Sequence, residues 1–391
     1  MNYIVISPYY PENFQQFTIE LANRGIQVLG IGQEPYEQLG VPLQAALTEY
    51  FRVDDLENVE EVKRAVAFLF YKHGPIDRIE SHNEYWLELD AELRQQFDIF
   101  GVKPADLVKT KYKSEMKKLF QEAGVPVVPG QVIKTLADVE PAVKELGLPL
   151  IAKPDNGVGA AATYKLESLA DVDHFKATWD QTTAYFFEQF ITSGEVCTFD
   201  GLVDSQGQIV FSTTFDYAHS PLDLVLYKMD NSYYILKEVP EKLRQYGESI
   251  VKTFGMKERF FHIEFFKDGD DYIALEYNNR PAGGFTIDVY NFAHSRDLYQ
   301  DYARVVLGED LPEQAADTQY CLATTRRDAK HYAYSEAEVL DKYRDQLQAI
   351  KRMPEAFAEL QGDMLYMLTT PDRAEMEQMI EDFSRLASFD N

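Results

Sequence analysis

Two alternating runs near residue 260 constrain this 391-residue chain more than any other stretch. They are RFFHIEFF (259–266) and YIALEYNN (272–279), and the segment between them is KDGDD. Apolar and polar residues alternate on both sides of this glycine-bearing turn, which is typical of an antiparallel hairpin. The chain is therefore expected to contain a sheet with one apolar and one polar face at this point.

The same alternation predicts the register of the hairpin. If residue 268 faces residue 272, apolar side chains stay on one face and polar side chains on the other, whereas a slip of one residue mixes them. Two carboxylates then face each other across the strands, and they repel unless a cation lies between them. The pairs expected in this register are Phe265 with Leu275, Glu264 with Glu276, and Ile263 with Tyr277.

The polar face of the hairpin has the composition of a magnesium site. Glu264 and Glu276 are opposed, and Asn278 lies one pleat further along as a neutral oxygen ligand. Oxygen ligands with few carboxylates suit Mg²⁺ that is shared with a phosphate group. Arg280 follows on the same face, where it can bind a phosphate or carboxylate oxygen. The alternative interpretation is a solvated face with scattered charges.

Composition and charge narrow the class of protein. The length exceeds what one hydrophobic core fills, and 45% hydrophobic residues indicate globular domains. A formal net charge of −27 argues against nucleic acids and anionic membrane surfaces as partners. Two cysteines, no signal-peptide pattern and no long apolar run predict a cytoplasmic protein without a disulfide framework or membrane span.

The order of strand and helix patterns predicts three domains. Residues 1–106 alternate buried strands with helices, as in an open parallel α/β domain. Residues 107–311 combine helices with antiparallel strands and include the hairpin. Residues 312–391 change to a small α+β pattern in which DMLYMLTT is a strand and Asp372 begins a final helix. The predicted fold class is therefore multidomain, α/β followed by α+β.

With these motifs in this order, the chain resembles the ATP-grasp superfamily of carboxylate-amine ligases over roughly residues 107–310. In that family, an acid on one strand and an E-x-N-x-R run on the next hold two Mg²⁺ ions, for which Mn²⁺ can substitute, and the triphosphate of ATP. The resemblance implies that Glu264, Glu276 and Asn278 bind the metal and that Arg280 stabilises an acyl phosphate. It also implies a mobile lid over about residues 125–190.

The resemblance assigns further residues to ATP. A lysine early in the helix before the lid corresponds to Lys113, with Lys109 and Lys111 as alternatives, and a Lys-Pro pair places Lys153 at the end of the first lid strand. The turn that closes over the phosphates corresponds to residues 156–161, although it is poor in glycine for this role. From this turn, the residues assigned to ATP are Asn156, Gly157 and Gly159.

The hinge of the family corresponds to EQFITSGE, residues 188–195. The resemblance implies that Glu188 and the backbone of Phe190 and Ile191 contact adenine, and that Glu195 binds the ribose hydroxyls. No GxxxxGK[ST] motif occurs, so a P-loop nucleotide site is not the competing explanation.

The resemblance implies a reaction in which a carboxylate attacks the γ-phosphate of ATP and an amine then displaces phosphate to form an amide. NNRPAGG is similar to the branch that joins amino acids, which includes L-amino-acid ligases and carnosine-synthase-like enzymes, and family habit suggests a homodimer. Candidate contacts for the second substrate are Asp216, Tyr217, His219, Arg326 and Arg327, with Glu80 and Glu84 for an ammonium group.

Two other functions use the same motifs. One is carboxylation of the biotin-carboxylase kind, although the chain has no biotin-accepting Met-Lys-Met and its C-terminal part is short. The other is nucleotide binding without catalysis, which predicts loss of a metal-binding acid or of Arg280, and both acids and Arg280 are present.

Overall fold

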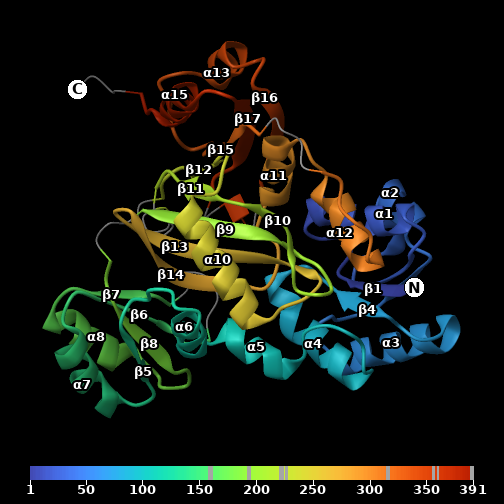
Figure 1. Cartoon of the computed structure of the whole chain (residues 1–391), viewed down its shortest axis with the longest axis horizontal. Helices are drawn as coiled ribbons and strands as arrows, with labels where there is room; N and C mark the ends of the chain where they lie inside the picture. The colour runs from blue at the N-terminus through green and yellow to red at the C-terminus, as the bar shows by residue number, and fades with distance from the viewer. Residues whose placement is uncertain are drawn as a thin grey trace.

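The structure of the chain, a computed structural model, describes residues 1–156, 162–191, 195–219, 224, 228–313, 318–354, 357–358 and 361–387. Its strands form a parallel sheet at the N-terminus, a small antiparallel sheet, and a large antiparallel sheet that runs into the C-terminal part (Figure 1). Within these ranges, no helix has the length and apolar character needed to cross a bilayer. The predicted fold class is confirmed.

The N-terminal sheet contains four described parallel strands in the order β3-β2-β1-β4. Its central strands are short runs of β-branched and aliphatic residues buried on both faces, as expected when helices cover both sides. The elements are β1 (Asn2–Ile6), η1 (Glu12–Phe14), α1 (Gln15–Asn23), β2 (Gln27–Gly32), η2 (Tyr36–Gln38), α2 (Val41–Ala46), β3 (Glu49–Arg52), α3 (Val59–His73), β4 (Arg78–Glu80), η3 (Glu84–Trp86) and α4 (Leu87–Gln96).

Two consecutive helices, α5 (Pro104–Lys111) and α6 (Lys113–Glu122), lead from the N-terminal domain to the small sheet. This sheet has the order β5-β8-β6-β7 and a hydrophobic cluster of its own between residues 133 and 187. We use the name lid for residues 125–190, where the sequence predicts one. Capping boxes at Thr135 and Ser168 begin its two helices. Its elements are β5 (Gly130–Ile133), α7 (Leu136–Leu146), β6 (Leu150–Pro154), β7 (Tyr164–Leu166), α8 (Leu169–Thr178) and β8 (Tyr185–Gln189).

The large sheet has the order β14-β13-β9-β11-β12-β15-β17-β16, with β10 paired to β9. Its strands are β9 (Val196–Val203), β10 (Ile209–Thr213), β11 (Phe215–Tyr217), β12 (Ser232–Ile235), β13 (Arg259–Asp268), β14 (Asp271–Asn278), β15 (Tyr320–Arg326), β16 (Leu347–Arg352) and β17 (Met364–Thr370). The accompanying helices are α10 (Glu241–Phe254), α11 (Thr286–His294), α12 (Leu298–Leu307), α13 (Glu336–Lys342) and α15 (Arg373–Ser384).

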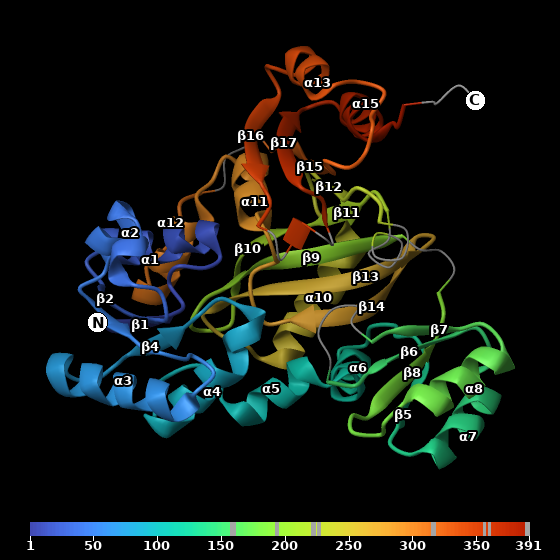
Figure 2. The ribbon, with the colours of Figure 1, turned by 180° about the vertical axis from the view of Figure 1, so that it is seen from behind.

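The two faces of the large sheet pack against different helices. Helix α10 crosses one face over β9, β13 and β14, in front of the sheet in Figure 1 and behind it in Figure 2. Phe199, Ile263 and Tyr277 point to this side. Helices α11 and α12 and the N-terminal domain lie on the other side, where Leu202 and Phe260 are buried. The polar residues that alternate with the α10-facing strand residues therefore face the N-terminal domain and α11.

The C-terminal strands extend this sheet. Strand β15 pairs with β12 over four residues, and β17 and β16 follow. The sequence pattern predicts β17 and α15 correctly, and Asp372 caps α15 by accepting hydrogen bonds from the backbone N–H groups of Ala374 and Glu375. The domain boundary near residue 312 stays a prediction, because strands on both sides of it share one sheet. Cys197 and Cys321 are buried free thiols.

Candidate functional site

The predicted pair of opposed acids is present on the hairpin of β13 and β14. Glu264 is the direct partner of Glu276, Ile263 pairs with Tyr277, and His262 pairs with Asn278. Side chains of directly paired residues project from the same face of a sheet. Glu264 and Glu276 therefore face the same side, away from α10.

The other predicted pair is wrong. Phe265 pairs with Ala274 rather than with Leu275, because a β-bulge shifts the register directly after Glu264. The bulge inserts one residue into β14, so Ala274 and Tyr277, three residues apart, both point into the core beneath α10. The turn is correspondingly tighter than expected, with Asp268 paired to Asp271.

Each of the two acids has a cationic neighbour. The Nε2 atom of His262 lies 3.3 Å from Oε1 of Glu264, and its Nδ1 atom lies 2.6 Å from Oδ1 of Asp200 on β9. Burial alone would lower the pKa of His262, but Asp200 and Glu264 raise it to about 9. Burial raises the pKa of Glu264, but the contact with His262 and the charges of Arg280 and Lys153 together lower it. Glu276 lies 3.6 Å from Nζ of Lys113.

Lys113 is positioned by the end of the lid strand β6. Its backbone N–H donates to the carbonyl of Asp155 at 2.8 Å, and the N–H and hydroxyl of Ser114 donate to the Asp155 carboxylate, each at 2.8 Å. Asp155 thus caps the first turn of α6 and couples it to Lys153, two residues earlier. The alternative lysines, Lys109 and Lys111, form surface ion pairs with Asp106 and Glu88.

Glu188 lies between two lysines. Its Oε2 atom is 3.1 Å from Nζ of Lys117, and Lys153 binds its other oxygen. Burial would raise the pKa of Glu188, but the two ammonium groups lower it to about 2, so the carboxylate stays charged. Sequence reasoning missed Lys117, although it lies one helical turn after Lys113 and therefore on the same face of α6.

The remaining residues assigned to ATP are those of the hinge and of the turn after β6. The N–H of Phe190 donates to the carbonyl of Pro149 at 3.1 Å, and its contact with adenine stays a prediction. Glu195 is exposed, and its carbonyl accepts from the Lys267 N–H at 3.0 Å. Asn156 is half-buried directly after Asp155. Gly157 and Gly159 lie outside the described residues.

The expected substrate contacts divide into two groups. Arg280 donates from Nε to Glu84 at 2.6 Å, and its charge also acts on Glu264, so this pair lies near the acid-bearing side of the hairpin. Tyr217 packs against the hydrophobic cluster on this side as well, and burial together with the charge of Glu264 raises its pKa. His219 is half-buried and stays a candidate.

The other residues face elsewhere. Asp216 is the strand partner of Cys197 on the α10 side, where Lys267 binds it at 2.5 Å. Glu80 is held by two arginines and does not lie open to an ammonium group. Arg326 donates to backbone carbonyls of α15, and with Arg327 it lines a separate cavity of about 340 Å³.

Comparison with known proteins agrees with this geometry. A model described as an ATP-grasp domain matches residues 146–288. The chain contains an ATP-grasp domain. Among curated proteins, the L-arginine-specific L-amino acid ligase of Bacillus subtilis is 23% identical over an alignment of 270 residues. The match covers 64% of this chain and 64% of that relative, so the chain spans less than two thirds of it.

Two solved structures show how widely the fold is shared. The L-amino acid ligase from Bacillus licheniformis superposes on this chain with a TM-score of 0.72 at 16% identity. The superposition covers 100% of this chain and 99% of the ligase chain. The biotin carboxylase domain of 2-oxoglutarate carboxylase from Hydrogenobacter thermophilus, in complex with MgADP, ADP and bicarbonate, has a TM-score of 0.68 at 15% identity, covering 95% and 86%. At these identities the likeness establishes the fold of the ATP-grasp protein.

Proposed function

We propose that this ATP-grasp protein is an ADP-forming ligase that activates a carboxylate as an acyl phosphate and joins it to an amine. The observation that carries the proposal is the pairing of Glu264 with Glu276, with Lys113 at 3.6 Å from Glu276 and Arg280 just beyond the same strand. Opposed acids, a lysine and an arginine at one strand end match the needs of a metal-bound triphosphate and a transferring phosphoryl group.

The donor set fits Mg²⁺. Among the described residues, no cluster of three or more His, Cys, Asp or Glu side chains could hold a metal by itself. Mg²⁺ bound to a nucleotide, however, takes one or two carboxylates and keeps phosphate oxygens and water as its other ligands. Glu264, Glu276 and Asn278 would hold it, and it would supply neutralisation of the charge on the β- and γ-phosphate oxygens.

The proposed chemistry needs no protein nucleophile. A carboxylate oxygen of the first substrate attacks the γ-phosphorus, and the bond to the β–γ bridging oxygen breaks to release ADP. The amine nitrogen then attacks the acyl carbon, phosphate leaves, and the nitrogen loses a proton. Lys113 and Lys153 would bind phosphate oxygens as point charges, while Arg280 would stabilise the acyl phosphate.

Two features of the chain support this division of roles. The lid has its own core and joins the body through α6 and the hinge, as a segment that excludes water from an acyl phosphate must. Asp155 links the end of β6 to the start of α6, so Lys153 and Lys113 are held in one unit. Electrostatic positioning of this kind supplies much of the rate enhancement in phosphoryl transfer.

Amino acids are the proposed substrates. The similarity to the Bacillus subtilis L-amino acid ligase and the NNRPAGG ending of the site strand support this class. Glu84 is the candidate for a substrate ammonium group, because it lies beside Arg280. We further propose a homodimer on family resemblance alone.

Phosphate release tests the proposal directly. The protein is incubated with ATP, Mg²⁺ and pairs drawn from a panel of amino acids, and in parallel with bicarbonate with and without biotin. Release that requires two amino acids, accompanied by a dipeptide mass, supports the ligase. Glu276→Gln should abolish release, whereas Lys109→Met, which changes a surface lysine of the preceding helix, should not.

Other outcomes would select the alternatives. Phosphate release only with bicarbonate and biotin would replace the ligase proposal with a carboxylating enzyme. The biotin carboxylase domain compared above has the same fold as this chain. Nucleotide binding without release under any condition would indicate a non-catalytic protein.

A further inference from the structure

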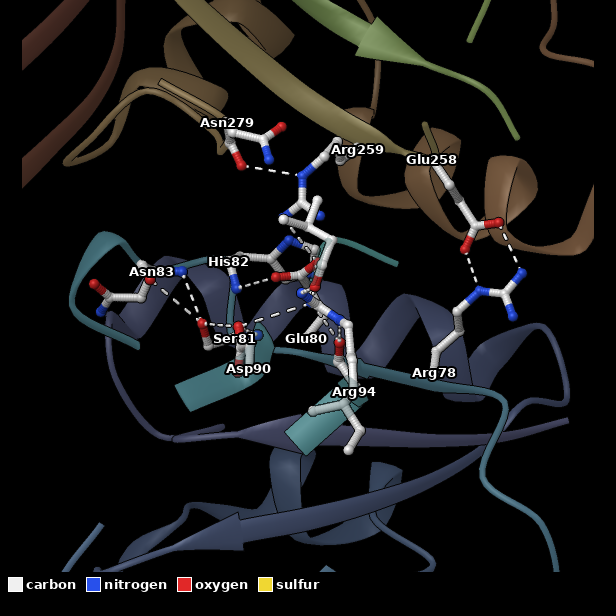
Figure 3. A network of polar contacts seen from close by, with 12 residues as sticks. Arg78, Glu80, Ser81, His82, Asn83, Asp90, Arg94, Glu258, Arg259 and Asn279 are labelled. Carbon is white, nitrogen blue, oxygen red and sulfur yellow. Dashed lines mark hydrogen bonds and ion pairs between the residues drawn. The ribbon is translucent and has the colours of Figure 1, made fainter. Parts of the chain in front are cut away.

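A buried ion network joins the N-terminal sheet to the hairpin that carries the acids (Figure 3). Glu80, at the end of β4, accepts hydrogen bonds at 2.9 Å from Arg94 and at 3.1 Å from Arg259, which begins β13. The three side chains are at most 6% exposed. Burial would raise the pKa of Glu80, but Arg259 and Arg94 lower it well below its usual range, so the network stays ionic.

Arg259 has a second contact, on the segment between two functional residues. Its Nε atom donates to the backbone carbonyl of Asn279 at 3.1 Å. This carbonyl belongs to the peptide group between Asn279 and Arg280. Asn279 itself directly follows Asn278, the predicted metal ligand. Asn279 is 1% exposed and its side-chain amide has no hydrogen-bond partner in the described part of the chain, so its side chain does not anchor it, whereas Arg259 holds its carbonyl.

The N-terminal domain tethers the same segment by a second route. Arg280 donates from Nε to Glu84, four residues after Glu80, and from Nη1 to the carbonyl of Pro281 at 2.8 Å. Residues 80–84 therefore hold residues 279–280 both through Arg259 and directly. A buried ion pair contributes little net stability compared with apolar packing, so orientation of the segment is the more useful role for Arg259.

We propose that Arg259, held by Glu80, is a positioning residue that orients the segment Asn278–Arg280 toward the metal-bound nucleotide. This inference rests on one part of the proposed function, the metal–nucleotide site, and not on the identity of the reaction. It requires that residues 276–280 bind a metal–nucleotide complex, whichever acid and amine are joined.

The chain offers a matched control at the same interface. Arg78 binds Glu258, the residue before Arg259, through Nε at 2.5 Å and Nη2 at 2.9 Å. This pair also bridges β4 and the start of β13, but among the described residues neither side chain forms a hydrogen bond or ion pair with residues 276–280. Arg259→Met and Arg78→Met therefore each remove one guanidinium from this interface, and only Arg259→Met frees the carbonyl of Asn279.

The first measurement does not depend on turnover. Mn²⁺ binding in the presence of a non-hydrolysable ATP analogue is followed by electron paramagnetic resonance of the free ion. Arg259→Met should weaken Mn²⁺ binding by about 10-fold, as expected when a group that orients a metal ligand is lost. Arg78→Met should bind Mn²⁺ like the wild-type protein. Equal weakening in the two variants, or none in Arg259→Met, overturns the proposal.

A conservative variant covers the case in which Arg259→Met does not fold. Arg259→Lys keeps the positive charge beside Glu80 but replaces the two nitrogens that bind Asn279 and Glu80 by a single ammonium nitrogen, so its Mn²⁺ affinity should lie between those of the wild type and Arg259→Met. Wild-type affinity in a folded Arg259→Lys protein would show that the bridge to Asn279 is dispensable and would also overturn the proposal.

Kinetics separate this inference from the proposed function. With an active amino-acid pair and saturating Mg²⁺, Arg259→Met should lower kcat by about 10- to 100-fold and leave the KM for ATP within about threefold. If none of the tested amino-acid pairs leads the wild-type protein to release phosphate, the proposed reaction is wrong. The Mn²⁺ measurement still decides the role of Arg259 in that case. Failure of the wild-type protein to bind Mn²⁺ with the analogue would overturn both.

Discussion

Substitution of Glu188 by glutamine should remove a defined pH dependence from the stability of the lid. Glu188 is buried on β8 of the lid, and Lys117 of α6 and Lys153 of β6 hold it charged. Its pKa falls from 4.5 to about 2, against the effect of burial. Because the folded pKa is lowered, the stabilisation is complete above pH 4.5 and is lost as the pH falls toward 2.

The size of the effect follows from this shift. A change of 2.5 pKa units corresponds to roughly 3 kcal/mol at neutral pH. As the pH is lowered from about 6 to about 3, Glu188 takes up its proton more readily in the unfolded protein than in the folded one. About 2 kcal/mol of the stabilisation is lost over this range. Glu188→Gln keeps the shape of the side chain but cannot titrate, so the difference in unfolding free energy between the two proteins should shrink by about 2 kcal/mol over that range.

Tryptophan fluorescence makes the measurement local. The chain has two tryptophans, and Trp179 belongs to the lid core. Urea unfolding in a Trp86→Phe background, with and without Glu188→Gln, reports the lid alone. Glu167→Gln is the control, because Glu167 is an exposed lid carboxylate paired with Lys165. A stability difference between the wild-type protein and the Glu188→Gln variant that stays constant across this pH range would refute the assignment of a lowered pKa to Glu188.

Three further predictions concern the site and the sheet. Arg280→Met should lower the rate of phosphate release by about 100-fold or more while circular dichroism stays unchanged, because charge on the acyl phosphate loses its stabiliser. Lys113→Met should raise the KM for ATP by at least about 10-fold, as measured by initial rates, and Lys109→Met should leave it unchanged, since only Lys113 of these two lies beside Glu276. Gly247→Ala should lower the free energy of unfolding by about 1–3 kcal/mol in urea titrations, because a Cβ atom on α10 would lie 2.0 Å from the ring of Phe199; wild-type stability would contradict this packing.

The opposed acids could be predicted because the signal is local. Two alternating runs and a short turn between them fix which side chains share a face, and the pairing of Glu264 with Glu276 follows. The bulge after Glu264 could not be predicted in this way. Ile273 and Leu275 satisfy the alternation without it, and only the packing of Ala274 and Tyr277 beneath α10 shows that a residue has been inserted.

The charged residues of the site also fall into two groups, those that local spacing could have predicted and those that it could not. Lys117 was accessible to sequence reasoning through its helical spacing from Lys113, and His262 through its alternation with Glu264. The partners Asp200 and Glu80 lie 62 and 179 residues from His262 and Arg259, so no local pattern connects them. Such contacts depend on how the sheets are brought together.

The pairing of β15 with β12 also depends on long-range assembly, and it has a practical consequence for dissecting the protein. A chain that stops at residue 311 would lose β15, β17 and β16 and leave the backbone of Ser232–Ile235 as a bare sheet edge beside the apolar side chains of Tyr233 and Ile235. Bare edges of this kind recruit strands from other molecules. The truncated protein should aggregate rather than survive as a smaller enzyme, so the segment after residue 311 is not a removable module.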